Sequence, residues 1–292
     1  MKSIHLQDFK AQPTVPLQKH PTNLNLEADD AQIEQTLKKA CKKLAKIQNA
    51  MYAHGKYAVL ICIQGMDTAG KDSLIREVFK EFNARGIVVH SFKTPTALEL
   101  RHNYLWRHYV ALPERGKFSV FNRTHYENVL ITRVHPEYIL NENLPNVATL
   151  ADVNHDFWER RFEEINNFEK TISQNGTLIF KFFLNISKDE QKNRLLRRLH
   201  KPNKQWKFSP SDLEERKLWG HYQACYQDLI TKTSKPYAPW FIIPSDHKPT
   251  ARYVVAKILL DTLKTYDDIK EPELDETIKD NLAAYINQLE ND

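Results

Sequence analysis

The chain has 292 residues, of which 41% are hydrophobic, and this is enough for one large α/β domain with a substantial core. No segment approaches the roughly 18–20 consecutive apolar residues of a membrane span. The polar start, MKSIHLQDFK, lacks the apolar core of a signal peptide. The three cysteines, Cys41, Cys62 and Cys225, are odd in number and far apart, which argues against a disulfide framework or a zinc site. These features predict a cytoplasmic protein with no membrane partner.

The net charge of +5 is unevenly distributed along the chain. Residues 267–292 contain nine acidic residues and two lysines, a net charge of −7, so the rest of the chain carries +12. Such an excess predicts a polyanionic partner. Residues 192–207 contain no acidic residue and seven basic ones: Lys192, Arg194, Arg197, Arg198, Lys201, Lys204 and Lys207. A solvated helix face is the usual explanation of a charge run, but such a face normally mixes both signs.

The predicted elements alternate between strands and helices. Residues 1–26 contain Pro13, Pro16 and Pro21 and little periodicity, which predicts an irregular arm before a single domain over 27–266. That domain reads in chain order as helix 27–53, strand 57–63, helix 71–83, strand 86–92, helix 96–111, strand 117–122, helix 125–134, helix 154–174, strand 177–184, helix 188–200, helix 211–232, strand 238–243 and helix 248–265. The alternation predicts a parallel sheet covered by helices on both faces. The acidic tail, 267–292, is expected to be peripheral.

A phosphate-binding loop is predicted between strand 57–63 and helix 71–83, and its residues are Gly65, Met66, Asp67, Thr68, Ala69, Gly70, Lys71, Asp72 and Ser73. Gly65 and Gly70 allow a tight turn in which backbone N–H groups point at an anion near the positive end of the helix dipole. Lys71 then reaches the phosphates as a point charge. Asp72 stands where a hydroxyl residue normally holds Mg²⁺. Asp67 and Asp72 would repel phosphate unless they bind the bridging metal; the alternative is a surface turn with two helix-capping aspartates.

Further candidate residues follow the strands that neighbour this loop. Asn122 stands at the carboxyl end of strand 117–122, where open α/β sheets bind their ligands. Arg123 could bind a phosphate through two hydrogen bonds, and Glu127 can reach the same crevice one helical turn later. Lys93 follows strand 86–92 and is a second candidate phosphate ligand, as is Arg133. Arg123 and Glu127 could instead form a simple surface ion pair, and His125 could be a packed edge residue.

The basic stretch is predicted to be a lid over residues 190–215. In phosphoryl-transfer enzymes such an element closes, excludes water and brings arginines onto the transferred group. Water must be excluded because a phosphoanhydride held near Mg²⁺ would otherwise hydrolyse. Trp206 and Phe208, within this stretch, are expected to pack.

Three segments resemble the polyphosphate kinase 2 family: GMDTAGKD, the run SFKTPTALELRHNYLWRHYVALPERGKFSVFNRTHYENVLITRVHP, and the later WKFSPSDLEERKLWGHYQACY. The similarity covers roughly residues 55–265, about the span of one such domain. The resemblance implies a thymidylate-kinase-like α/β fold with a helical lid, and transfer of phosphate between inorganic polyphosphate and nucleotides with Mg²⁺, or Mn²⁺, as cofactor. It also implies reversibility and assembly as a homodimer or homotetramer.

The family's site residues transfer position by position. Its loop aspartate and lysine fall on Asp67 and Lys71, and the metal contact is assigned to Asp67 with Glu127 as a second candidate. Its lid cations fall on Arg194, Arg198, Lys204 and Lys207. Many members have Asp-Arg-Ser where this chain has Asn122-Arg123-Thr124. This form resembles the subgroup that phosphorylates both nucleoside mono- and diphosphates, which implies AMP and ADP as acceptors and ATP as a product.

Two other functions fit part of the sequence. An ATP-dependent nucleoside monophosphate kinase would share the fold and the loop, and would work without polyphosphate. A nucleic-acid-binding protein would explain the basic surface, and Trp206 and Phe208 could stack bases. However, the ordered phosphate-binding loop and the absence of a recognisable groove-reading module argue against a nucleic-acid partner.

Overall fold

Five apolar segments form one sheet in which every pair of neighbouring strands is parallel, in the order β2-β3-β1-β4-β5. The computed structural model describes residues 1–292. The strands are β1 (Ala58–Gly65), β2 (Ile87–Ser91), β3 (Phe118–Asn122), β4 (Thr177–Asn185) and β5 (Trp240–Pro244). All residues of β1, β3 and β5 are buried, as expected for strands covered on both faces. The predicted fold class and all five predicted strands are therefore confirmed.

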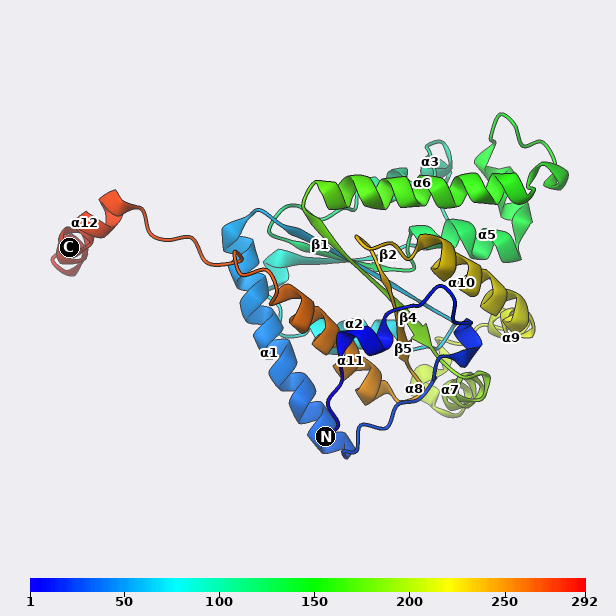
Figure 1. Ribbon diagram of the computed structural model, residues 1–292, viewed down its shortest axis with the longest axis horizontal. Coiled ribbons are helices and arrows are strands. Elements are labelled where there is room, and N and C mark those ends of the chain that lie inside the picture. The colour runs from blue at the N-terminus through cyan, green and yellow to red at the C-terminus, as the bar shows by residue number, and fades with distance from the viewer.

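Helices cover both faces of this sheet (Figure 1). On one face α1 (Asp30–His54) and α2 (Lys71–Phe79) pack with α11 (Lys248–Leu263). On the other face α6 (His155–Gln174) packs on β4 and contacts α10 (Trp219–Thr233) and the 3-10 helix η4 (His125–Val129). The remaining helices are α3 (Ala97–Leu100), α4 (Trp106–Tyr109), α5 (Ile131–Val134), α7 (Lys188–His200), α8 (Pro202–Gln205), α9 (Ser211–Lys217) and α12 (Glu276–Glu290).

The helix predicted over residues 96–111 is wrong, because the structure has two single turns there, α3 and α4. The side chain of Asn103 accepts a hydrogen bond from the backbone N–H of Leu105, 2.8 Å away, and so starts a new turn. Two other predicted helices are interrupted. The segment 125–134 begins as the 3-10 helix η4 before α5, and 211–232 divides at Leu218 into α9 and α10.

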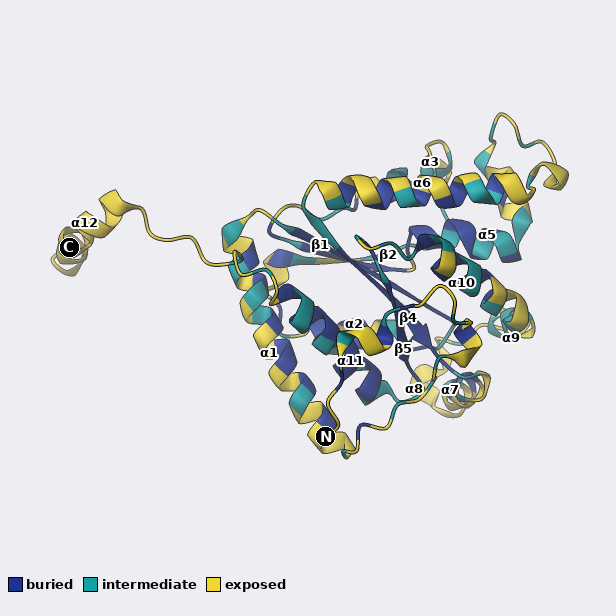
Figure 2. Ribbon diagram, viewed as in Figure 1, coloured by how far each residue is buried: buried dark blue, intermediate teal, exposed yellow.

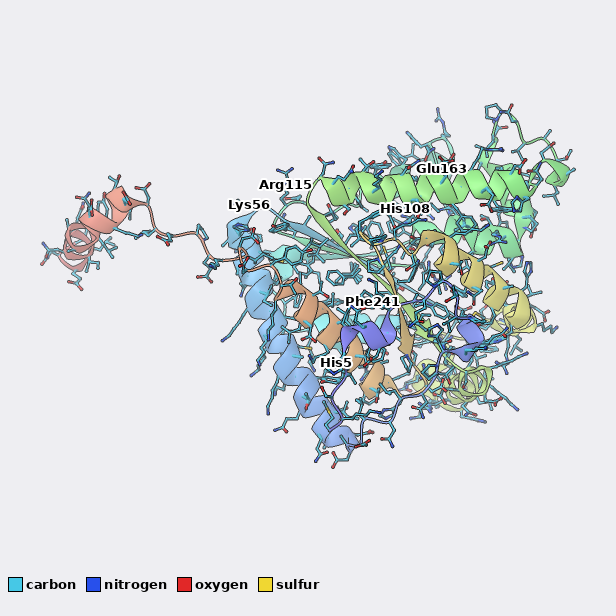
Figure 3. All side chains as sticks on the ribbon, viewed as in Figure 1. His5, Lys56, His108, Arg115, Glu163 and Phe241 are labelled. Atoms are coloured by element: carbon cyan, nitrogen blue, oxygen red, sulfur yellow. The ribbon has the colours of Figure 1, made fainter.

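The N-terminal arm is irregular apart from two short 3-10 helices, η1 (Leu6–Phe9) and η2 (Leu17–Lys19). Its apolar residues nevertheless belong to the main core, since Phe9, Leu17 and Leu26 are all buried. The arm runs along β5, where the backbone N–H of Ala11 donates to the carbonyl of Trp240 at 2.8 Å. Phe241, labelled in Figure 3, lies beside it. The arm therefore covers the β5 edge of the sheet.

The acidic tail extends away from this body and ends in α12 (Figure 1). Every residue of α12 is exposed (Figure 2), and no buried residue lies beyond Leu263. Its apolar side chains are therefore not buried against any other part of the chain. None of the helices combines the length and the apolar character that crossing a lipid bilayer would require.

Candidate functional site

The phosphate-binding loop has the backbone that the two glycines predicted. Gly65 and Gly70 have φ angles of 153° and 109°, in the region that side chains rarely adopt. A Cβ atom on Gly65 would lie 3.0 Å from Leu184 Cβ, so the loop also needs glycine for space. The loop begins at the last residue of β1, in the middle of the sheet, and its last three residues form the start of α2. Such a helix N-terminus attracts anions.

Lys71 is folded over this loop. Its ammonium group donates to the carbonyl oxygens of Gly65 at 2.6 Å and Met66 at 3.3 Å. An ammonium group has three donors, so one is left for a ligand. Burial lowers the pKa of Lys71, and the Asp67 carboxylate opposes that shift. A bound phosphate would also favour the charged form of the ammonium group and so oppose the effect of burial.

The carboxyl end of β3 meets the loop, as predicted. The amide nitrogen of Asn122 donates to a carboxylate oxygen of Asp72 at 2.9 Å, while the amide oxygen of Asn122 is buried without a partner. Arg123 lies 3.4 Å from Asp67 and has a positive φ angle of 58°. An aspartate in place of Asn122 would therefore put a second carboxylate beside Asp72, and the two would repel each other.

Glu127 and His125 point in opposite directions from η4. Glu127 lines the site; burial raises its pKa, although Arg123 and Lys71 oppose this effect. His125 has no exposed surface and contacts Glu169 in the core, 3.1 Å away. His125 is thus a packed residue, the alternative that the sequence left open.

Two hollows meet at the phosphate-binding loop. The first, named the acceptor pocket after the role proposed for it below, has a volume of about 550 Å³ and apolar walls that include Leu100, Tyr104 and Tyr222. The second, the basic groove, has a volume of about 770 Å³ and passes in front of α2, α7 and α11. Five residues line both hollows: Asp67, Lys71, Phe92, Lys93 and Arg123. The predicted candidates Asp67, Lys71, Lys93 and Arg123 therefore lie at one junction.

The basic groove is lined by eleven lysine and arginine residues and only two acidic ones, Asp67 and Asp72. The predicted cations Arg198, Lys204 and Lys207 are among them, and so are four that sequence analysis did not select: Arg76, Arg197, Lys248 and Arg252. The last two lie on the first turns of α11, which follows the carboxyl end of β5. The rule that ligands bind at the carboxyl ends of parallel strands could have identified them.

Arg194 borders this groove but uses its guanidinium group within the protein. It is 4% exposed and donates to the carbonyl oxygens of Thr68, Ala69, Ser245 and Asp246 at 2.6–3.0 Å. These bonds connect α7 to the phosphate-binding loop and to the end of β5. In this arrangement Arg194 holds the phosphate-binding loop in place. The role of lid cation stays a prediction for Arg198, Lys204 and Lys207.

Two other predicted residues lie differently from expectation. Trp206 was expected to pack but is 77% exposed, with the Lys207 ammonium group 5.0 Å from its ring centre. It lines the groove, and α8, which precedes it, has no buried residue. Arg133 lines neither hollow; it binds Asp228 at 2.6 Å and stacks near Phe162.

The acceptor pocket contains further polar residues that the sequence did not single out. Arg107 is buried and donates to the carbonyl oxygen of Lys93 at 2.8 Å, which fixes the loop after β2. Asn128, Asp212 and Glu215 line the same pocket. Asn128 lies in η4, and Asp212 and Glu215 lie in α9; all three fall within the two longer segments that resemble the family, but nothing in those segments shows that they meet in one pocket.

Comparison with known proteins is consistent with this geometry. Residues 27–271 match the model of the family described as polyphosphate kinase 2. An ADP-polyphosphate phosphotransferase of Rhodopseudomonas palustris is 44% identical over 229 residues, which is 78% of each chain. An AMP/ADP-polyphosphate phosphotransferase of Meiothermus ruber is 43% identical over 223 residues, 76% of this chain and 78% of the relative.

A solved structure agrees over nearly the whole chain. The crystal structure of polyphosphate kinase 2 from Arthrobacter aurescens TC1 superposes with a TM-score of 0.83 at 33% identity, covering 95% of this chain and 96% of the other. The family match over residues 27–271 includes the phosphate-binding loop, the junction and the predicted lid segment. The chain therefore belongs to the polyphosphate kinase 2 family.

Proposed function

We propose that this protein transfers the terminal phosphate of inorganic polyphosphate to nucleoside mono- and diphosphates, converting AMP to ADP and ADP to ATP, and that the transfer is reversible. The observation that carries the proposal is the junction of two unlike hollows at Lys71 and Arg123. The basic groove suits a long polyanion, and the acceptor pocket has the size and apolar walls that suit a nucleoside. The relatives named for ADP and for AMP/ADP support the same acceptors.

The lining of the basic groove favours polyphosphate over ATP as the phosphate donor. A donor nucleotide needs an apolar slot for its base, but only Phe92 and Trp206 among the groove residues are apolar, and Trp206 is exposed. A polyphosphate chain carries about one negative charge per phosphate and no base, so regularly placed cations are all that it needs. The groove therefore favours a polyphosphate-dependent enzyme over an ATP-dependent nucleoside monophosphate kinase.

Phosphate transfer to a nucleotide needs charge compensation more than proton removal. The attacking oxygen belongs to a phosphate that is already ionised at neutral pH, so a general base is unnecessary. The residues must instead offset the repulsion between two anions and hold them in line. Lys71, Lys93 and Arg123 stand where the two hollows meet, and can contact donor and acceptor together.

The junction fits a divalent cation such as Mg²⁺ or Mn²⁺. No group of three or more His, Cys, Asp or Glu side chains forms an all-protein metal site, but Mg²⁺ beside phosphates commonly uses only one or two carboxylates. Asp67 and Glu127 line the junction side of the acceptor pocket, and the unpaired amide oxygen of Asn122 lies nearby. We propose Asp67 as the principal ligand and Glu127 as a second one. When bound, the cation would neutralise charge on the transferred phosphate.

The test of this function is an assay of purified protein with Mg²⁺, polyphosphate and either AMP or ADP, with products resolved by chromatography. We expect ADP from AMP and ATP from ADP, and no product when ATP replaces polyphosphate as donor to AMP. Product from ADP alone would keep the polyphosphate donor but contradict the dual-acceptor proposal. Transfer from ATP without polyphosphate would contradict the donor assignment.

Polyphosphate binding should weaken above pH 8 because Lys248 loses its positive charge there. Burial and the neighbouring cations, Arg194 and Arg197 among them, lower the pKa of Lys248 to about 8. The ammonium group is charged below that pH and neutral above it, whereas a bound polyanion favours the charged form. We therefore expect the Kd for polyphosphate at constant ionic strength to rise between pH 7.5 and 9.5, by at most about tenfold per pH unit.

The variant Lys248→Arg retains its charge over that range, so its Kd should stay flat where that of the wild type rises. Calorimetric titration at several pH values, without nucleotide, measures this. An equal slope in both proteins would assign the pH dependence to another group.

We also propose that the protein assembles as a homodimer or homotetramer. The uncovered apolar side chains of the tail support this proposal: Leu274, Ile278, Leu282, Tyr285, Ile286 and Leu289. A single 15-residue helix is marginally stable in water, so contact with a second copy would stabilise α12. Light scattering of the full chain tests it, and a molar mass of 34.3 kDa would contradict it.

A further inference from the structure

A buried polar cluster lies directly beneath η4, on the side away from the acceptor pocket. Lys181 of β4 and Glu169 of α6 both have no exposed surface. The Lys181 ammonium group uses all three donors, on Glu169 at 2.7 Å, on the carbonyl of Thr233 at 2.7 Å and on the Tyr126 hydroxyl at 2.8 Å. Glu169 in turn accepts from the Tyr126 hydroxyl at 2.6 Å and contacts His125 at 3.1 Å.

Charged residues are energetically unfavourable in a protein core compared with apolar residues of similar size. Burying a carboxylate and an ammonium group carries a large desolvation penalty, and replacing a buried ion pair with apolar residues is often neutral or stabilising. Burial alone would raise the pKa of Glu169, but Lys181 and His125 hold it below its ordinary value. Lys181 and Glu169 form an ion pair at 2.7 Å with no exposed surface, an arrangement better suited to fixing geometry than to adding stability.

The geometry that the cluster fixes is that of η4. His125 and Tyr126 point into the core, where His108, labelled in Figure 3, lies against the His125 ring. Arg123, two residues before this pair, lines both hollows, and Glu127, the residue after it, lines the acceptor pocket. Arg123 also has a left-handed backbone, which costs free energy and persists only where surrounding contacts hold it.

We propose that Lys181 and Glu169 are positioning residues for phosphoryl transfer, and that they act through Tyr126. The inference rests on the proposed function. The Tyr126 hydroxyl connects the two charges to η4, which carries Glu127 and begins two residues after Arg123. Lys181 belongs to β4, which pairs with β1 beside Cys62, so the cluster connects η4 to the strand next to the phosphate-binding loop. We infer that this connection sets the distance between the phosphate-binding loop and the segment that contains Arg123 and Glu127.

The test is the variant Tyr126→Phe, which keeps the ring and removes the connecting hydroxyl. We expect kcat to fall by about 10- to 100-fold, because small misplacements of catalytic groups have effects of that size. The KM for polyphosphate should change by less than about twofold, since the basic groove is untouched. A purely structural role would lower kcat only by the fraction of protein unfolded, which circular dichroism measures.

Tyr237→Phe is the matched control. Its hydroxyl donates to the carbonyl of Asn166 at 3.0 Å, so the change removes one tyrosine hydrogen bond to the same helix, α6, without touching η4. We expect wild-type kcat. If both variants lost kcat equally, or if Tyr126→Phe kept wild-type kcat, the inference would be overturned.

Two further measurements cover the other outcomes. If Tyr126→Phe does not fold, the double variant Lys181→Met with Glu169→Gln removes both charges together and leaves neither buried alone; wild-type kcat there would also overturn the inference. A crystal structure of a folded variant tests it without turnover. We expect Arg123 and Glu127 to be displaced relative to the phosphate-binding loop, and unchanged positions would refute positioning even if the wild type lacked polyphosphate-dependent activity.

Discussion

Replacing Lys71 with alanine is expected to lower kcat by at least about 1,000-fold while leaving the protein folded. Removing one preorganised donor from a developing anion costs about 100- to 1,000-fold, and a cation that bridges transferred and accepting phosphates is worth about 1,000-fold or more. Lys71 is the cation between the two hollows that lies at the first residue of α2. Single-turnover assays with saturating polyphosphate and ADP measure the loss.

The fold should tolerate this change because the two carbonyl oxygens that Lys71 contacts can be hydrated in the open site. Lys80→Ala is the matched control, since it removes an exposed lysine from the other end of the same helix. It should keep wild-type kcat. A Lys71→Ala enzyme with near-normal turnover would remove the phosphate-binding loop from the mechanism.

The second large effect is expected for Asp67→Asn. The carboxylate lines both hollows, and an uncharged amide is a weaker ligand for a hard divalent cation. We expect kcat to fall by about 100-fold and the Mg²⁺ concentration for half-maximal rate to rise by about tenfold. A titration of rate against Mg²⁺ at fixed polyphosphate and ADP measures both.

The control for this titration is Asp228→Asn, which removes a carboxylate that binds Arg133 outside both hollows. Its Mg²⁺ dependence should match that of the wild type. An unchanged Mg²⁺ titration for Asp67→Asn would argue against a metal role and leave Asp67 as the partner of Arg123 alone.

Sequence reasoning identified the part of the site that is local in sequence. Gly65, Gly70 and Lys71 follow one strand within a few residues, and Asn122 and Arg123 end another, so strand order alone brings them together. In the structure Ile63 pairs with Asn122 in the neighbouring strand, so the carboxyl ends of these two strands lie side by side as expected.

What sequence reasoning missed depends on tertiary contacts. Periodicity cannot show that the Asn103 side chain starts a new turn, so the helix over 96–111 was predicted as continuous. Charge counting cannot separate Arg194, which is buried, from Arg197, which is exposed, although both belong to one basic run. Lys248 and Arg252 lie far from that run in sequence, and the end of β5 brings them beside it.

The hydrogen bonds of Arg194 limit which part of the predicted lid could move if the lid closes. Its guanidinium group connects α7 to the carbonyls of Thr68 and Ser245, so the first two turns of α7 are held against the phosphate-binding loop. Any closing movement of the predicted lid that keeps these bonds would have its axis beyond Arg194, and the moving part would begin near Arg197. The amides before that axis would exchange their hydrogens slowly, and those of α8 quickly, even before substrate arrives.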